Sequence, residues 1–305
     1  MLTKPILTNY MMTTRRSFIK STAVYSASLL VAPSLLNYNH KYIGLQLYTV
    51  RDAMQSNPSA TLARVSKLGY NSVEGATYTG TQKFYGMEPA EFSRLLKQNG
   101  LIMPSSHYRL GEEKTNGETT KGTLLSNWGK AVDDAAAAGI KYMVCAFLSE
   151  QERGGLDHYK KIADDFNKAA ETCKKAGIQF CYHNHAFEFD KQDGKFPYEV
   201  LLDNTDKNLV KMEMDMYWVN KAGQDPMAII NQHPGRFPLW HVKDMDKTPE
   251  HNFTEVGNGS IDFKKIFKSA DKAGLQYFFV EQDKTPGDPF NSITQSINYI
   301  KKNLV

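Results

Sequence analysis

The chain has 305 residues, 41% of them hydrophobic, and a formal net charge of +4 at pH 7. Four of the 37 basic residues lie within residues 1–36, which contain no acid, so the remainder carries 33 basic and 33 acidic side chains. A neutral surface provides no general attraction for nucleic acid, and we expect no nucleic-acid partner. The hydrophobic content can fill a sizeable core.

Residues 1–36 are predicted to be an export signal rather than part of the fold. Arg15-Arg16 precedes an uncharged stretch from Ser21 to Leu36 that is rich in Ala, Ser, Leu and Val. A twin arginine followed by a short apolar region is typical of bacterial twin-arginine signals, and an ordinary basic N-terminus is the alternative. The apolar region, interrupted by Pro33, is too short and too polar for a stable membrane span. We therefore expect a periplasmic protein whose folded part is residues 37–305.

From Tyr42 onward, short apolar runs alternate with amphipathic stretches. Eight strands are predicted, at Ile43–Tyr48, Ser72–Glu74, Ile102–His107, Tyr142–Phe147, Gln179–His183, Val210–Asp215, Leu239–Val242 and Tyr277–Glu281. Helices are predicted at Ser59–Leu68, Pro89–Gln98, Thr123–Ala138, Tyr159–Ala176, Tyr198–Leu202, Pro226–Gln232, Phe263–Ala273 and Asn291–Asn303. Five helix-to-strand joints carry a glycine suited to a C-terminal cap, at Gly69, Gly100, Gly139, Gly177 and Gly274. This alternation predicts an α/β protein with a parallel sheet, and the length favours one closed (β/α)8 TIM barrel.

Two further features complete this outline. The longest non-periodic region, Leu110–Gly122, is polar and glycine-rich and is predicted to be a loop over the active face. Cys145, Cys173 and Cys181 lie in strand-like or helical patterns, so we expect buried thiols rather than a disulfide framework.

Several predicted strands end in residues that bind metal ions. Asp215, His241 and Glu281 end the last three strands, and Glu188 lies just past the fifth. In a barrel of parallel strands these ends converge on one rim. A single histidine at a strand end is more often structural, but four such coincidences on consecutive strands favour a site. Three carboxylates and one imidazole suit a divalent cation, with Mn²⁺ favoured over Mg²⁺, Co²⁺ or Zn²⁺ by the oxygen-rich ligation.

For each of the other residues at the predicted rim, both a functional and a structural interpretation are open. Glu74 is a second carboxylate or a helix N-terminal acid, and His107 binds a sugar hydroxyl or is structural. Lys243 shares the inward face of His241 and either stabilises an enolate oxygen or is solvated. Trp218 either stacks on a sugar ring or packs in the core.

Several segments of the chain resemble a known family over about Ile43 to Ile300. They are Gly44-Leu45-Gln46-Leu47-Tyr48-Thr49-Val50-Arg51-Asp52, Tyr182-His183-Asn184-His185, Phe187-Glu188-Phe189, Glu213-Met214-Asp215-Met216-Tyr217-Trp218, Ala222-Gly223-Gln224-Asp225-Pro226, His241-Val242-Lys243-Asp244, Glu255-Val256-Gly257-Asn258-Gly259 and Val280-Glu281. The family is that of the sugar phosphate isomerases/epimerases, xylose-isomerase-like barrels that also include the apurinic endonucleases.

The resemblance implies a metal site built from a Glu, an Asp, a His and a Glu on strands five to eight. Asp215, His241 and Glu281 match the last three positions, whereas His183 stands where the family glutamate is usual. We assign the fourth ligand to Glu188, with His183 as the rival. Family epimerases move a proton with paired glutamates, so here an imidazole of His183 or His185 is the alternative base.

The resemblance implies a divalent-metal-dependent sugar isomerase or epimerase that removes a proton next to a carbonyl. The predicted export and the lack of a phosphate-binding motif favour an unphosphorylated sugar or keto-sugar as substrate. A 3-keto-glycoside lyase, which eliminates from the same enediolate, is the alternative. A sugar-binding barrel without turnover is less favoured, and a phosphodiester hydrolase is disfavoured because no Asp-x-His pair follows His241. The partner is a small carbohydrate, and a homo-oligomer is left open.

Overall fold

Eight parallel strands form a closed barrel in the computed structural model, which describes residues 42–112, 114–115 and 118–305. The predicted export signal and the boundary after residue 36 lie outside the described residues. The order around the barrel is β1-β12-β9-β8-β7-β6-β3-β2. These strands are β1 (Gly44–Gln46), β2 (Ser72–Gly75), β3 (Ile102–Tyr108), β6 (Tyr142–Cys145), β7 (Gln179–His183), β8 (Val210–Asp215), β9 (Leu239–Val242) and β12 (Tyr277–Val280).

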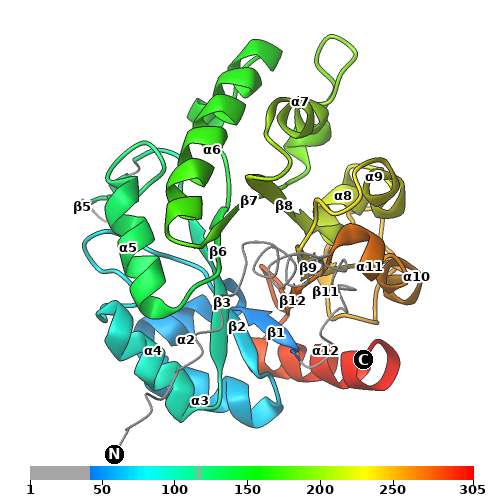
Figure 1. Ribbon diagram of the computed structural model, residues 1–305. Helices are drawn as coiled ribbons and strands as arrows, with labels where there is room; N and C mark the ends of the chain where they lie inside the picture. The colour runs from blue at the N-terminus through cyan, green and yellow to red at the C-terminus, as the bar shows by residue number, and fades with distance from the viewer. Residues whose placement is uncertain (1–41, 113, 116–117) are drawn as a thin grey trace, which may run out of the picture. The chain divides into compact units, whose positions relative to one another are not determined.

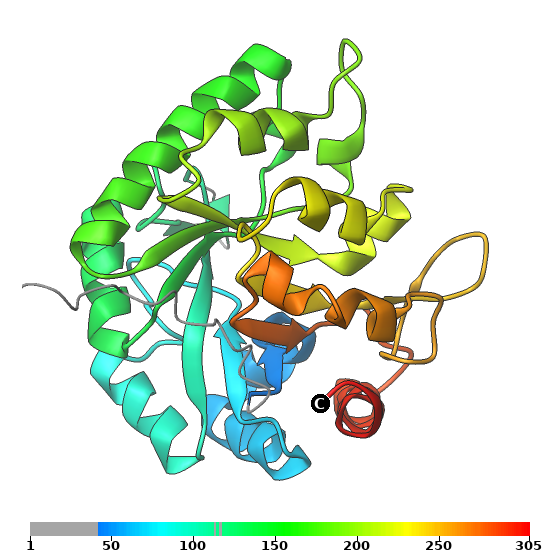
Figure 2. The ribbon, with the colours of Figure 1, turned by 45° about the vertical axis from the view of Figure 1, so that its right-hand side comes forward.

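Helices surround the barrel on the outside (Figures 1 and 2). They are α2 (Arg51–Ser56), α3 (Pro58–Leu68), α4 (Pro89–Gln98), α5 (Trp128–Ala138), α6 (Leu156–Lys175), α7 (Pro197–Asn204), α8 (Met216–Lys221), α9 (Pro226–Gln232), α10 (Phe263–Phe267), α11 (Ala270–Ala273) and α12 (Pro289–Asn303). Short 3-10 helices occur at η1 (Leu47–Val50), η2 (Glu150–Glu152) and η3 (Phe187–Phe189). Within the described ranges, no helix combines the length and the apolar character that a membrane crossing requires.

Local sequence signals explain where many of these elements begin and end. The five glycines predicted as C-terminal caps all have positive φ, which costs glycine little because it has no Cβ. At the opposite end, α9 and α12 begin with proline after an aspartate whose side chain accepts a backbone N–H of the first turn. Along α4, Phe92 and Leu96 are buried while Arg94 between them is exposed, as amphipathic spacing requires.

The eight predicted strands and the TIM-barrel fold are confirmed, although β1 and β6 each end two residues earlier than predicted. Other differences lie at the loops. The helix predicted at Phe263–Ala273 is divided into α10 and α11, because Lys268 and Ser269 leave the helical run. The predicted loop Leu110–Gly122 contains a small antiparallel pair, β4 (Lys114–Thr115) and β5 (Glu118–Thr119). A second pair, β10 (Asp244–Met245) and β11 (Phe253–Thr254), was not predicted. The three cysteines are buried and free, as predicted.

One level of the barrel interior is apolar. Val144, Cys181, Leu239 and Phe279, from four different strands, form a cluster of fully buried side chains that we call the apolar layer. Gly44 of β1 faces this layer, and a Cβ there would lie 2.4 Å from the Phe279 ring. Glycine is therefore required at this position, since any larger residue would displace the phenyl ring. Beyond this layer, towards the carboxyl ends of the strands, the interior becomes polar.

Candidate metal centre

The polar part of the barrel interior begins two residues after the apolar layer on three of its four strands. Side chains of a strand alternate between its two faces, so residues two apart point the same way. His183 thus follows Cys181 on β7, His241 follows Leu239 on β9, and Glu281 follows Phe279 just beyond β12. Because the strands are parallel, these side chains meet at one end of the barrel, where TIM-barrel active sites lie.

These three side chains and Asp215 form what we call the first ligand group: His183, Asp215, His241 and Glu281. One ligand atom from each lies within 4.8 Å of all the others, and all four residues are buried. Asp215 Oδ2 lies 3.3 Å from His183 Nε2 and 3.6 Å from His241 Nδ1, which is 3.0 Å from Glu281 Oε2. Such an arrangement of two imidazoles and two carboxylates can hold a divalent cation.

His183 is oriented as a ligand by its second ring nitrogen. Its Nδ1 lies 3.0 Å from the carbonyl oxygen of Ala146, so Nδ1–H donates there and Nε2 is left facing Asp215. A hydrogen bond of this kind fixes the tautomer of most metal-binding histidines. His183, the predicted alternative to Glu188 as the fourth ligand, is therefore oriented as a metal ligand would be.

The structure does not bring Glu188 into the group, and this corrects the predicted ligand set. Glu188 lies on η3, and its carboxylate accepts hydrogen bonds from the Tyr182 hydroxyl and the His185 backbone N–H. Because it is buried, its pKa rises from 4.5 to about 7. The chain leaves the strand after His183 and turns, which directs this carboxylate back towards β7 instead of into the barrel.

A second ligand group lies beside the first and shares one histidine with it. Its members are Glu74, His107, Glu213 and His241, with ligand atoms again within 4.8 Å of one another. Glu74 Oε2 lies 2.6 Å from His241 Nε2 and 3.3 Å from His107 Nε2. Glu213 Oε2 lies 2.8 Å from His107 Nε2 and 3.4 Å from His241 Nε2. His241 thus presents Nδ1 to one group and Nε2 to the other.

The two glutamates of the second ligand group have opposite protonation tendencies. Burial alone would raise the pKa of Glu74, but His107 and His241 outweigh it and lower the pKa to about 2. Burial raises the pKa of Glu213 well above its usual value, and the adjacent Glu74 carboxylate adds to this effect. These surroundings therefore favour the charged form of Glu74 and the protonated form of Glu213.

Glu74 and His107 occupy the interior rather than the loops. Glu74 is fully buried and accepts hydrogen bonds from Gln46 and Ser105, so the alternative of a helix N-terminal acid is wrong. It does not line the pocket described below, whereas His107 does. Burial lowers the pKa of His107 to about 4.

Lys243 is buried among three carboxylates, so the alternative of a solvated lysine is wrong. Its Nζ lies 2.6 Å from Glu281 Oε2, 2.9 Å from Asp283 Oδ1 and 3.1 Å from Asp215 Oδ2. Burial alone would lower the pKa of Lys243, but these carboxylates raise it well above the usual value. The ammonium group is therefore a fixed positive charge at the rim.

His185 and Trp218 pack against each other at the edge of the centre. The ring centroids are 5.3 Å apart, and Phe147 and Phe187 flank the same imidazole. Burial lowers the pKa of His185 well below its usual value, and its Nδ1 makes no hydrogen bond within the described residues. Trp218 does not line the pocket, so its predicted contact with a sugar is not supported by its position.

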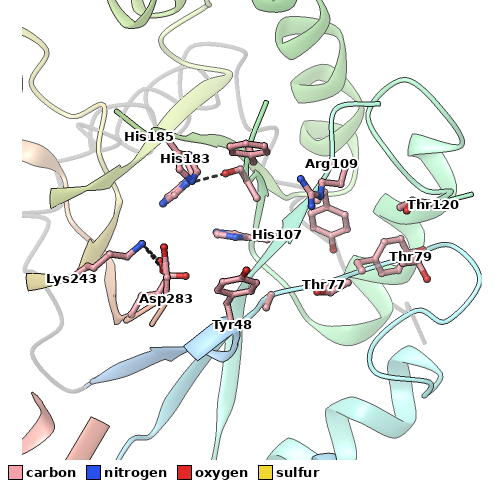
Figure 3. A pocket seen from close by; sticks show the side chains of 16 residues that line it. Tyr48, Thr77, Thr79, His107, Arg109, Thr120, His183, His185, Lys243 and Asp283 are labelled. Carbon is pink, nitrogen blue, oxygen red and sulfur yellow. Dashed lines mark hydrogen bonds and ion pairs between the residues drawn. The ribbon is translucent and has the colours of Figure 1, made fainter. Parts of the chain in front are cut away.

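A pocket of about 450 Å³ opens onto the first ligand group. His183, Glu281 and Lys243 line one end of it, together with His107 and His185. Figure 3 shows Lys243 and Asp283 facing His107 and His183 across this end. Thr77, Thr79 and Thr120 lie at the other end, so the loop predicted over the active face contributes Thr120 to the wall.

Sequence reasoning missed several residues of this centre: Gln46, Tyr48, Arg109, Glu213 and Asp283. Two of them carried a detectable signal, because Glu213 precedes Asp215 by two positions and Asp283 follows Glu281 by two. Period-two alternation places each on the same face as a predicted ligand. Tyr48 and Arg109 lie outside that pattern, and only the tertiary structure shows that they line the pocket.

A closed barrel of eight parallel strands with helices on its outside is a TIM barrel, and its rim of histidines and carboxylates could hold a metal ion. The xylose isomerase-like TIM barrel family matches residues 62–303, and the chain belongs to it. A solved sugar phosphate isomerase/epimerase from Parabacteroides distasonis is 29% identical, with 87% of this chain and 95% of that one covered and a TM-score of 0.72.

Two other relatives extend the comparison. The inosose dehydratase of Clostridium beijerinckii is 28% identical over 165 residues, which are 48% of this chain. This chain spans only about half the length of that relative, 55%. A structure of IOLI protein with a binding zinc atom has a TM-score of 0.64 at 15% identity, with 86% of this chain and 96% of that one covered. At that identity the similarity shows the fold alone.

Proposed function

We propose that this protein is a divalent-metal-dependent sugar isomerase or epimerase that removes a proton next to a carbonyl of an unphosphorylated sugar or keto-sugar. The observation that carries the proposal is the pocket that ends on His183, Glu281 and Lys243. The sugar phosphate isomerase/epimerase similar to this chain, and the inosose dehydratases, support a reaction of this chemical class.

Residues of the first ligand group would hold the cation: His183, Asp215, His241 and Glu281. When bound, a divalent cation polarises a substrate carbonyl and stabilises the negative charge of an enediolate. Three carboxylates and one imidazole would favour Mn²⁺. With His183 in place of Glu188 the donors would be two nitrogens and two oxygens, a set that favours Zn²⁺ or Co²⁺.

The chain supplies groups for both the proton and the developing charge. His185 lines the pocket with a neutral imidazole, because burial lowers its pKa, and a neutral imidazole can accept the proton. Lys243 stays protonated between its carboxylates and offers positive charge to the developing oxyanion. The aromatic side chains of Phe147 and Trp218 pack against the His185 ring and hold it in place.

A second candidate function, 3-keto-glycoside lyase, is favoured by a neighbouring cavity. This cavity of about 780 Å³ shares Ala76, Thr77, Thr79 and Thr120 with the first pocket. A single sugar ring would fill the end near Lys243, so the adjoining space suits the departing group of a glycoside. Elimination starts from the same enediolate and needs no additional residue at the ligand groups.

Solvent deuterium distinguishes the two reactions in a single experiment. The metal-loaded protein is incubated in D₂O with a 3-keto-glucoside that carries a chromogenic leaving group. Epimerisation gives deuterium at the carbon next to the carbonyl in intact glycoside, whereas elimination releases the chromophore. Chelation should abolish either signal, and His185→Gln should lower it strongly while His158→Gln, a change of an exposed histidine, should not. Turnover that survives full removal of metal would refute the proposal.

We also propose export through the twin-arginine route, which the sequence alone supports. Replacing Arg15 and Arg16 together by lysine should retain the protein in the cytoplasm of an expressing bacterium. Cell fractionation measures this, and an unchanged periplasmic fraction would contradict the proposal.

A further inference from the structure

We propose that the barrel holds a second divalent cation in the second ligand group, Glu74, His107, Glu213 and His241, with the His241 imidazole joining it to the first. This goes beyond the proposed function, for which one cation is sufficient. The second ligand group lies behind the substrate pocket, since only His107 among its members lines that pocket. The second cation would therefore organise the centre without touching substrate.

The spacing of the ligand atoms fits a tetrahedral ion. Consecutive atoms around the group, Glu74 Oε2, His107 Nε2, Glu213 Oε2 and His241 Nε2, are separated by 3.3, 2.8, 3.4 and 2.6 Å. A tetrahedron with metal–ligand bonds of about 2.0–2.1 Å has edges of about 3.3 Å. Small adjustments of these side chains would thus place all four atoms in bonding range. Two imidazole nitrogens and two carboxylate oxygens are a donor set that Zn²⁺ or Co²⁺ accepts.

A separate observation concerns Glu213, whose Oε1 atom is buried. This oxygen makes no hydrogen bond within the part of the chain that the structure describes, and the residue is fully inaccessible to solvent. Buried carboxylate oxygens nearly always have a donor or a cation beside them. The carboxylates of Glu213 and Glu74 both contact His107 Nε2, so two acidic groups lie side by side in the barrel interior. A cation between the two carboxylates compensates both charges, and rotation of the Glu213 carboxyl group would present either Oε1 or Oε2 to it.

The formal charges around Lys243 and the two ligand groups also support a second cation. Five acidic side chains gather there: Glu74, Glu213, Asp215, Glu281 and Asp283. Lys243 contacts three of them and contributes one positive charge. When all five are ionised, Lys243 and one divalent cation in the first ligand group leave this set short of positive charge, and a second divalent cation reduces that deficit.

His241 connects the two positions through its two nitrogens. Nδ1 faces Asp215 and Glu281 of the first ligand group, and Nε2 faces Glu74 and Glu213 of the second. Binding of both cations replaces the protons on the two nitrogens, and these protons leave to solvent. The imidazole ring then separates the ions by more than the roughly 3.5–4 Å of oxygen-bridged two-metal sites.

Metal stoichiometry tests the proposal. The full chain is freed of metal by chelation, loaded with Zn²⁺, separated from unbound ion by gel filtration and analysed by mass spectrometry for zinc per chain. We expect two equivalents in the unaltered protein and one in Glu213→Gln, which keeps the size of the side chain but removes its charge. Glu255→Gln is the matched control, because Glu255 is a buried glutamate held by Ser292 outside both groups. It should retain two equivalents.

Two results would overturn the second site: one equivalent in the unaltered protein, or two retained in Glu213→Gln. His107→Gln provides an independent variant should Glu213→Gln fail to fold, as judged by circular dichroism, and it should likewise bind one. Cobalt gives a further readout, since visible absorption per chain should fall to about half in either variant if both sites are tetrahedral. A protein that binds two ions but turns over no sugar would contradict the proposed function and leave this inference standing.

Discussion

Two levels of the barrel interior, only two residues apart along the same strands, have opposite chemistry. The apolar layer of Val144, Cys181, Leu239 and Phe279 contains no ionisable group except a buried thiol. Two residues further along three of these strands lie His183, His241 and Glu281. They are buried to a similar degree but are surrounded by charged side chains. The strands thus carry both a packed core and a site of buried acids within a short distance.

The difference shows how a barrel separates stability from chemistry. Burial of the apolar layer is favourable, because each side chain leaves water without losing hydrogen bonds. Burial of the ligand groups is unfavourable until cations compensate them, because desolvation disfavours every charged form. The favourable burial of the apolar layer therefore offsets the unfavourable burial of the ligand groups. Substitutions in each layer should then have separable effects.

The largest effect is expected from the first ligand group. Asp215→Asn and Glu281→Gln should each lower kcat/KM by at least about 10²-fold, since each removes a charged metal ligand. Asparagine at position 215 can still accept the Trp218 backbone N–H that Asp215 accepts at the start of α8, so the barrel should stay folded. Steady-state kinetics and circular dichroism measure the two properties. Full activity in either variant would remove the proposed site.

The apolar layer should show the reverse behaviour. Leu239→Ala is expected to lower the free energy of unfolding by about 2–5 kcal/mol, because it opens a cavity in a fully buried cluster. Metal bound per chain should not change. Leu125→Ala is the matched control, since Leu125 is 59% exposed and should alter stability by no more than about 0.5 kcal/mol. Urea unfolding monitors both variants, and a Leu239→Ala protein that loses metal but not stability would contradict the separation.

The smallest effect concerns Glu188, a buried carboxylate outside both ligand groups. Lys243 and His241 hold the pKa of Glu281 well below its usual range, whereas burial raises that of Glu188 from 4.5 to about 7. Between pH 4.5 and 7 the Glu188 side chain loses its proton in the unfolded chain but keeps it in the folded protein. The free energy of unfolding should therefore fall as pH rises from 4.5 to 7, by at most about 3 kcal/mol from this group.

Comparison of two variants isolates this contribution. Glu188→Gln should flatten the fall in stability between pH 4.5 and 7, because glutamine does not titrate. Glu171→Gln, a change of an exposed glutamate on α6, should leave the pH profile unchanged. Denaturant unfolding at pH 4.5, 6 and 8 provides the measurement. Equal profiles for the unaltered protein and Glu188→Gln would show that the carboxylate does not carry a raised pKa.

Sequence by itself determined the strand positions, the glycine caps and three of the four members of the first ligand group. These depend on local patterns: apolar runs of strand length, glycine after a helix, and an acid or histidine where a strand ends. Asp215, His241 and Glu281 were found because parallel strands bring their carboxyl ends to one rim wherever the strands lie in the chain.

Only the tertiary structure decided the fourth member and the direction in which each buried charge points. Whether His183 or Glu188 faces the barrel depends on the turn after β7, which directs Glu188 to Tyr182 and leaves His183 beside Asp215. The placement of Glu213 between His107 and His241 likewise joins three strands across the interior. Contacts between distant strands fix these orientations, and no local pattern encodes them.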